Sequence, residues 1–482
     1  MSGDVSMPYG AFLERAAQVA HTLVSLGVQP GDRIVAQVAK SDMALALYAG
    51  CVQAGVVYLP LNTAYTAAEV SYFLGDSGAR LLICDPKNVE GLTPVVAHVG
   101  ASLETLDADG YGSFATIADA QPTEFDTVDR AGGDLAALLY TSGTTGRSKG
   151  AMLSHNNLLS NSAVLAEAWR FDESDVLLHA LPIFHTHGLF VATNISLLAG
   201  SAMIFLPKFD VDHMVSGLPQ SSVMMGVPTF YTRLLGDARF DQNLTSHMRL
   251  FVSGSAPLLA ETHVEFETRT GHKILERYGM TETNMNTSNP YDGDRRAGTV
   301  GPALAGVEVK ITDPVSGVEL PKGEIGSIEV RGPNVFQGYW QMPEKTAEEL
   351  RSDGFFITGD LGVIDADDYV SIVGRSKDLI ISGGYNIYPK EIEEVLDDQP
   401  GVLESAVVGT PDADMGERVV AVLVEKQGSS VDVEQVQNAI GSKLARFKCP
   451  RRIIVIEEMP RNTMGKVQKN VLRAAIEKGD IG

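Results

Sequence analysis

The sequence predicts an α/β protein with a large N-terminal domain and a small α+β domain at the C-terminus. Three observations lead to this prediction. Strand-like and helix-like segments alternate up to about residue 260, short strands with Gly-rich turns follow residue 296, and a compact unit follows residue 377. Such alternation is typical of mainly parallel sheets, and 482 residues are too many for one ordinary domain.

The first elements follow from apolar spacing and from helix-start signals. Residues 12–26 carry apolar side chains at helical spacing. The predicted apolar face consists of Leu13, Ala16, Ala17, Ala20, Val24 and Leu26. Residues 32–39 (DRIVAQVA) and 79–84 (ARLLIC) are predicted to be buried strands, and Thr66 with Glu69 forms the capping box of a helix between them.

The pattern changes twice in the second half of the chain. Three short alternating segments are predicted strands of a small β-barrel: 307–313, 323–332 and 369–374. Three further strand-like runs and two helix-like runs then predict a separate, mobile α+β domain. We therefore expect domains at 1–376 and 377–482, with a hinge near 375–378 that includes Lys377.

Composition excludes several classes of protein. The net charge of −23 argues against a nucleic-acid surface, which needs a basic stripe. Cys51, Cys84 and Cys449 are scattered, so we expect neither a disulfide framework nor a thiolate zinc site, and a cytoplasmic location fits. No apolar run approaches the ~18 residues of a membrane span, and the N-terminus lacks the pattern of a signal peptide.

One loop indicates a phosphate ligand. Residues 134–140 (DLAALLY) are a predicted buried strand, and the ten residues after it contain three glycines, five hydroxyl side chains and two cations. They are Thr141, Ser142, Gly143, Thr144, Thr145, Gly146, Arg147, Ser148, Lys149 and Gly150. Backbone amides that a ligand can approach, many donors and positive charge suit a polyphosphate.

Other interpretations of this loop are weaker. A Walker A loop that starts at Gly143 would need Gly where Ser148 stands. Gly146, Ser148 and Gly150 have the spacing of a nucleophile elbow, but an elbow turns sharply from a strand into a helix. Ser148 lies eight residues past the strand, and the residues that follow (AMLSH) are typical of a second strand. A plain surface loop is the remaining alternative.

Six further motifs follow in order and resemble the acyl-adenylating (AMP-binding) superfamily, which contains acyl-CoA synthetases and peptide-synthetase adenylation domains. They are LPIFHTHG (181–188), VSGSAPL (252–258), ERYGMTE (276–282), ITGD (357–360), GRSKDLIISGGYNIYPKEIE (374–393) and PRNTMGKVQK (460–469). The resemblance runs from about residue 9 to the end of the chain. It implies an adenylate-forming N-terminal domain and a C-terminal lid domain.

The resemblance also implies a two-step reaction. A carboxylate attacks the α-phosphate of ATP to give acyl-AMP and pyrophosphate, and the thiol of coenzyme A then displaces AMP. By resemblance, the loop from Thr141 to Lys149 holds the β- and γ-phosphates, Thr281 contacts the α-phosphate, and Glu282 binds Mg²⁺ with help from Thr145. The residues implied at adenine, ribose and pantetheine are Gly254, Ser255, Ala256, Tyr278, Gly279, Asp360, Arg375, Gly383 and Gly384.

Two further residues have implied catalytic roles. Lys466 enters the site during adenylation and contributes charge, so a lysine acyltransferase or deacylase acting on it would control the enzyme. His185 is the implied gate of the acyl pocket, and His187 lines that pocket. His179, His185 and His187 also suggest a zinc site, but without a nearby carboxylate ligand this alternative is weak.

Four stretches resemble the malonyl-CoA synthetases of this superfamily: FHTHGLF, VPTFYTRLL, ERYGMTETNMNTSNPYDGDRRAGTVG and PRNTMGKVQKN. A malonate site must pair a second carboxylate, and an arginine fork is the natural partner. The candidates are Arg233, Arg295 and Arg296, with His187 as an additional donor. Thr186 and Met280 are expected to bound the pocket and to decide whether methylmalonate fits.

Two alternatives stay open: another short-chain or aryl acyl-CoA synthetase, and a stand-alone adenylation module that loads a carrier protein. The chain also departs from the usual pattern. Relatives carry a longer segment before the first motif, so a short form with reduced activity is one expectation. The phosphate loop has Arg147 and Ser148 where Lys or Glu and Pro are more common.

Overall fold

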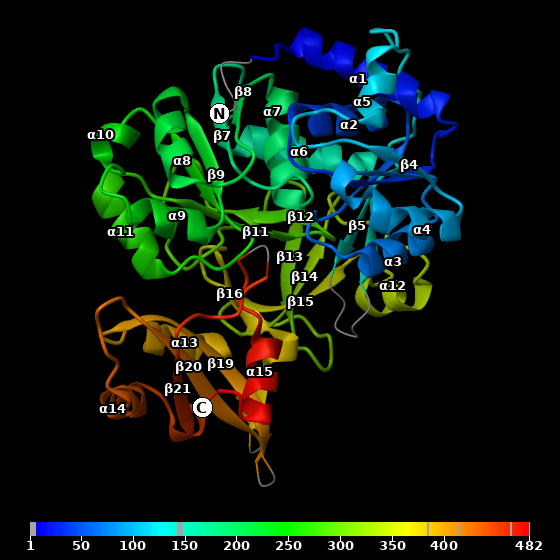
Figure 1. Cartoon of the computed structure of the whole chain (residues 1–482). Coiled ribbons are helices and arrows are strands. Elements are labelled where there is room, and N and C mark those ends of the chain that lie inside the picture. Colours follow the sequence, from blue (N-terminus) through cyan, green and yellow to red (C-terminus); the bar gives the residue numbers. More distant parts are fainter. Residues whose placement is uncertain (1–5, 142–147, 383–384, 413–414, 463–464, 482) are drawn as a thin grey trace.

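The computed structural model describes residues 6–141, 148–382, 385–412, 415–462 and 465–481. Three sheets form the large N-terminal part, and a fourth sheet forms the smaller C-terminal part, which lies below the rest in Figure 1. No helix in the described segments is long and apolar enough to cross a membrane. The predicted α/β class, with a large and a small domain, is confirmed.

The first sheet has the strand order β4-β3-β1-β2-β5-β6 and is parallel except for β6. Its strands are β1 (Arg33–Gln37), β2 (Val57–Pro60), β3 (Leu81–Cys84), β4 (Ser102–Thr105), β5 (Leu135–Thr141) and β6 (Lys149–Ser154). Its helices are α1 (Tyr9–Ser25), α2 (Asp42–Gln53), α3 (Ala67–Ser77), η1 (Pro86–Asn88), α4 (Val89–Val99) and α5 (Ser113–Asp119).

Two local predictions for this region can be checked. The capping box of Thr66 and Glu69 is present at the start of α3, so that prediction is confirmed. The apolar face of α1 was predicted partly wrongly, because Leu13 and Val24 are about half exposed. Phe12, Val19 and Leu23 are buried in their place, because packing against α2 decides which edge of a broad apolar stripe is covered.

The second sheet has the order β12-β11-β10-β9-β7-β8 and is parallel except for β12. Its strands are β7 (Val176–His179), β8 (Ala202–Phe205), β9 (Val223–Gly226), β10 (Leu250–Ser253), β11 (Leu275–Met280) and β12 (Asn284–Ser288). The helices around it are α6 (His155–Ala168), η2 (His187–Thr193), α7 (Asn194–Ala199), α8 (Val211–Gly217), η3 (Leu218–Gln220), α9 (Pro228–Leu235), α10 (Gln242–Thr245) and α11 (Ala260–Thr270).

The third sheet is antiparallel, in the order β13-β14-β15-β16. Its strands are β13 (Glu308–Thr312), β14 (Gly326–Arg331), β15 (Phe356–Ile364) and β16 (Val370–Arg375), with helix α12 (Pro343–Glu349) before β15. The predicted small barrel is therefore an open sheet, since the described strands β13 and β16 are its two edges. A small core around Ile328 and Val330 packs against Tyr278 of β11.

The C-terminal part has one sheet and cores on both of its faces. Its strands are β17 (Ile380–Ser382), β18 (Tyr385–Ile387), β19 (Val402–Asp412), β20 (Gly416–Glu425) and β21 (Arg452–Ile456). Its helices are η4 (Ser376–Asp378), α13 (Pro389–Asp397), α14 (Val433–Lys443), η5 (Arg446–Lys448) and α15 (Lys469–Lys478). This part therefore has hydrophobic cores of its own, separate from those of the large part.

Candidate active site

The predicted phosphate loop joins the adjacent antiparallel strands β5 and β6. The strand expected after the loop is therefore confirmed, and a nucleophile elbow is ruled out. Helix α3 holds both ends of the loop: the Tyr140 hydroxyl bonds Asp76 at 2.5 Å, and the Tyr72 hydroxyl donates to the Ser148 carbonyl at 2.7 Å. The predicted residues Ser142, Gly143, Thr144, Thr145 and Gly146, and likewise Gly383 and Gly384, lie outside the described residues.

Glu282, which follows β11, is buried beside the end of β5. Its Oε1 is 3.2 Å from the Thr141 hydroxyl and 3.2 Å from the Tyr339 hydroxyl. Burial raises the pKa of Glu282, although the nearby charge of Lys149 and these hydroxyls oppose the shift. Lys149 also bonds Glu349 at 3.2 Å and lies over the Tyr339 ring, so charged and polar groups converge beside the phosphate loop.

Sequence reasoning missed Tyr339 and Glu349. The Tyr339 hydroxyl donates to Glu349 Oε2 at 2.6 Å, and this link connects the two carboxylates beside Lys149. Both residues lie far from the phosphate loop along the chain, so their spacing gave no signal. Chain folding brings them there because the backbones of residues 150–152 and 337–340 bond each other.

Asp360, in β15, is buried and engaged at both oxygens. The Tyr278 hydroxyl donates to Oδ2 at 2.6 Å, and Arg375 Nε lies 2.8 Å from Oδ1. Burial and the Asp360 charge together raise the pKa of Tyr278 well above its ordinary value. Gly279 follows at a bulge between β11 and β12, where a Cβ would lie 1.9 Å from the Asn284 carbonyl oxygen, so only glycine fits.

Arg277 is the residue of this region that the sequence analysis overlooked. It lies in β11 between Glu276 and Tyr278, is 4% exposed, and its Nε and Nη2 have no hydrogen-bond partner among the described residues. Burial lowers its pKa to about 9. A Cβ at Gly254 would lie 2.4 Å from the central carbon of this guanidinium, so the glycine makes room for the arginine.

More buried polar atoms without partners lie near Arg277. In the described part of the chain they include Thr186 Oγ1 and His187 Nε2. His187 Nδ1 is 3.1 Å from the Ser255 hydroxyl, next to Gly254, and its pKa is lowered by burial and by the charge of Arg277. Buried polar atoms normally have partners, so this group, which we call the acyl cluster (Thr186, His187 and Arg277), has the character of a ligand site.

Lys466 reaches this region from the C-terminal part. Its pKa is lowered to about 8, mainly because surrounding protein desolvates the ammonium group and then because Arg375 is near, although Asp360 and Glu282 oppose the shift. The residue keeps a solvent-exposed surface. His185 is close enough for Lys466 and Arg277 to lower its pKa, together with burial, to about 3. Lys466 therefore lies between the acyl cluster and Asp360.

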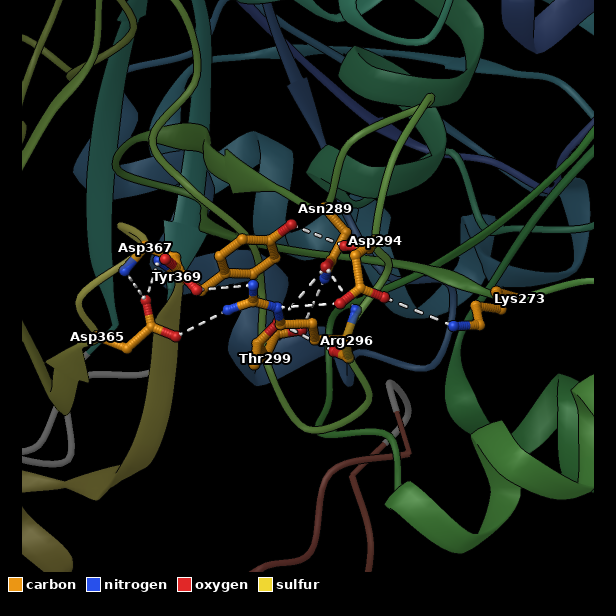
Figure 2. A network of polar contacts seen from close by, with 8 residues as sticks. All are labelled: Lys273, Asn289, Asp294, Arg296, Thr299, Asp365, Asp367 and Tyr369. Atoms are coloured by element: carbon orange, nitrogen blue, oxygen red, sulfur yellow. Dashed lines mark hydrogen bonds and ion pairs between the residues drawn. The ribbon is translucent and has the colours of Figure 1, made fainter.

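The arginines predicted to pair a substrate carboxylate have other partners. Arg296 binds Asp294, Asp365 and Asp367 and lies 4.0 Å from the centre of the Tyr369 ring (Figure 2). Arg295 donates to the carbonyls of Lys273, Pro290 and Tyr291. Arg233 is exposed on α9, over the Phe209 ring. Arg295 and Arg296 therefore already have partners in the protein, and the pairing of a substrate carboxylate by Arg233, Arg295 or Arg296 stays a prediction.

The other predicted residues have these positions. Gly254, Ser255 and Ala256 follow β10, and Thr281 follows β11, beside the same edge of the sheet. Met280 packs against the first core, and Lys377 is exposed in η4.

His179, His185 and His187 are the residues of the alternative zinc site. No group of three or more His, Cys, Asp or Glu side chains that could hold a metal occurs in the described segments. Glu282 and Thr141 supply oxygen atoms beside the phosphate loop, which suits a magnesium ion bound mainly by phosphates and one carboxylate.

Two family models match the chain: the AMP-binding enzyme model over residues 1–340 and the AMP-binding enzyme C-terminal domain model over residues 391–466. A malonate–CoA ligase of Arabidopsis thaliana is 37% identical, covering 88% of this chain and 74% of that protein. ATP-bound MatB from Rhodopseudomonas palustris is 58% identical, with a TM-score of 0.97, covering 99% of this chain and 94% of that one. Apo MatB covers the same shares at 58% identity, with a TM-score of 0.86.

Proposed function

The chain belongs to the AMP-binding enzyme family, and we propose that it is a malonate–CoA ligase. ATP and malonate give malonyl-AMP and pyrophosphate, and coenzyme A then gives malonyl-CoA and AMP. The observation that carries this proposal is Arg277, a buried guanidinium in the acyl cluster with two nitrogens that have no hydrogen-bond partner among the residues the structure describes. The similarity to a plant malonate–CoA ligase supports it independently.

A second carboxylate on the substrate would pair with Arg277, whose Nε and Nη2 have no hydrogen-bond partner among the described residues. A buried cation without a counter-ion is costly, and a carboxylate that accepts two N–H bonds from a guanidinium compensates for it. Malonate carries one carboxylate to react with ATP and a second to bind Arg277, with Thr186 and His187 as further donors. Acetate, propionate or benzoate would leave Arg277 unpaired, so the pocket favours a dicarboxylate.

The nucleotide would bind on the other side of Lys466. In this proposal Asp360 accepts the ribose hydroxyls, Arg375 supports it, and Tyr278 stacks on adenine beside the turn of Gly254, Ser255 and Ala256. Lys149 and the loop from Thr141 bind the β- and γ-phosphates, and Thr281 contacts the α-phosphate. The first half-reaction brings two anions together, so the charge of Lys466 is needed where carboxylate and phosphate meet.

Magnesium fits the oxygen atoms beside the phosphate loop. We assign Glu282 as its protein ligand, with Thr141 adjacent and Thr145 as the hydroxyl expected from the loop. When bound, the ion would neutralise phosphate charge. Burial raises the pKa of Glu282, and its contacts with Thr141 and Tyr339 orient the carboxylate toward the loop.

The structure resembles ATP-bound MatB more than apo MatB, with TM-scores of 0.97 and 0.86. This difference supports an arrangement for adenylation, in which Lys466 is in the site. For the second half-reaction the C-terminal domain, residues 377–482, would rotate about the hinge at 375–378, with Lys377, and Gly383 and Gly384 would then face the pantetheine of coenzyme A.

Two further expectations remain part of the proposal. Lys466 has solvent-exposed surface, so an acyltransferase could modify it and a deacylase restore it; modification would remove its charge and stop adenylation. The three cysteines are unpaired, which is consistent with a cytoplasmic location.

The test is pyrophosphate release with ATP and magnesium for malonate, methylmalonate, succinate, acetate, propionate and benzoate, each with and without coenzyme A. We expect strong turnover with malonate and coenzyme A and little with the monocarboxylates. Turnover that prefers a monocarboxylate would keep the family and overturn the malonate assignment.

A further inference from the structure

Lys40 and His179 form a pair near the acyl cluster, and the proposed reaction gives neither residue a role. Lys40 follows β1 of the first sheet, and its Nζ is 2.9 Å from His179 Nδ1 and 2.7 Å from the His179 carbonyl oxygen. The same Nζ lies 4.1 Å from the centre of the Phe205 ring. His179 and Phe205 are the last residues of the neighbouring strands β7 and β8. Lys40, which follows a strand of the first sheet, therefore contacts the carboxyl ends of two strands of the second sheet.

These hydrogen bonds select one tautomer of His179. Its Nε2 is 2.9 Å from the Gly188 carbonyl oxygen, which can only accept, so Nε2 must carry the proton. Nδ1 is then an acceptor and needs a donor, and the Lys40 Nζ supplies it. Because the His179 ring is fully buried, the loss of Lys40 would leave Nδ1 buried without a donor, which is costly.

The Gly188 carbonyl begins the π-helix η2 (His187–Thr193) and also accepts the Thr193 hydroxyl at 2.9 Å. The turn before it is tightly closed, because a Cβ at Gly188 would lie 2.0 Å from the Pro182 carbonyl oxygen. The hydrogen bond from His179 Nε2 to the Gly188 carbonyl therefore fixes the backbone of this turn. Single turns of π-helix occur often at functional sites.

The same turn carries two of the three residues of the acyl cluster. Thr186 Oγ1 and His187 Nε2 are buried and unpartnered in the described residues. His187 immediately precedes the carbonyl that His179 holds, so a shift at Gly188 would move the imidazole away from Arg277. A misplacement of about 1 Å in a binding group can cost about 100-fold in rate.

We propose that Lys40 and His179 are positioning residues, which fix the turn of Thr186 and His187 so that the acyl pocket matches the second carboxylate of its substrate. This inference rests on the proposed function and deepens it. It also explains why a third histidine stands close to the two pocket histidines without forming a metal site.

The test measures KM separately for ATP and for the acid in Lys40→Met, which keeps the aliphatic length and removes the donors. We expect KM for malonate to rise about tenfold, and malonate to be favoured over methylmalonate less strongly, while KM for ATP stays within about twofold. The exposed Lys87→Met is the matched control for the same exchange. Leu23→Ala, in the core of α1, is the control for a loss of stability alone.

A second pair of variants tests the hydrogen bond itself. His179→Gln keeps an N–H that can reach the Gly188 carbonyl, and His179→Leu does not, so Gln should keep KM for malonate closer to the wild-type value. These variants also decide the matter if Lys40→Met does not fold. Unchanged KM for the acid in Lys40→Met and His179→Leu, with melting temperatures lowered as in Leu23→Ala, would show a merely structural pair and overturn the inference.

The same experiment separates this inference from the proposed function. If the wild-type enzyme uses another acid, the malonate assignment fails, and KM for that acid is measured in the same variants. A selective rise in that KM would still support Lys40 and His179 as positioning residues.

Discussion

The proposed nucleotide side and the proposed acyl side of the site differ in how their buried charges are compensated. On the nucleotide side, charged groups already have protein partners: Asp360 holds Tyr278 and Arg375, and Lys149 holds Glu349. On the acyl side, Arg277 has two nitrogens without partners in the described residues. The charges of the first side are thus compensated within the protein, whereas in our proposal the charge of Arg277 is compensated by a substrate anion.

Lys466, where the two sides meet, should give the largest effect. Lys466→Ala removes the charge at the meeting point of carboxylate and phosphate, so adenylation, measured by pyrophosphate release, should fall about 100- to 1,000-fold. Thioesterification of supplied malonyl-AMP should change little. Lys478→Ala, at the end of α15, is the control, and an equal loss of both half-reactions would contradict separate conformations for the two steps.

Arg277→Met tests the unpartnered side directly. The variant cannot pair the second carboxylate, so kcat/KM for malonate should fall about 100-fold, about 2.7 kcal/mol, while KM for ATP changes little. Relative activity with propionate should rise, because a buried charge without a partner has gone. Arg233→Met, on the exposed face of α9, is the matched control. If Arg233→Met showed the loss instead, the assignment of Arg277 would be wrong.

Gly254→Ala tests whether the turn after β10 contributes to binding of the acid or of the nucleotide. The new methyl would collide with the Arg277 guanidinium, so KM for malonate should rise about tenfold, with a smaller change for ATP. Gly91→Ala, where a Cβ meets no atom within 4 Å, is the control. A rise confined to KM for ATP would place Gly254 on the nucleotide side alone, as its motif implies.

The smallest effect is expected from pH. A lysine with a pKa near 8 is charged below that pH and loses its charge above it, so adenylation should be level up to about pH 7.5 and fall as pH rises through 8. Lys466→Arg keeps its charge, so its remaining activity should not fall over this range. A wild-type profile that is level to pH 9.5 would contradict the lowered pKa.

Motifs predicted the nucleotide side better than the acyl side. Tyr278, Glu282, Asp360, Arg375 and Lys466 were named from ordered motifs, and the structure brings them together, although their roles remain predictions. The motifs predicted the partner of the second carboxylate among Arg233, Arg295 and Arg296, whereas our proposal assigns this role to Arg277. A buried arginine in β11 was visible within ERYGMTE, but β11 carries both inward and outward side chains, and sequence alone did not show which partners Arg277 lacks.

The sequence by itself determined the α/β class, the capping box of α3, the strand–loop–strand of the phosphate site and the order of the motifs. These features depend on local periodicity and on residues close together in the chain. Only the tertiary structure decided that Arg296 is bound by Asp365 and Asp367, that Arg277 Nε and Nη2 lack a hydrogen-bond partner among the described residues, and that Lys40 reaches His179. In each case the surroundings of a charged side chain come from segments that are far apart in the sequence. Local sequence patterns do not show which of these segments come together.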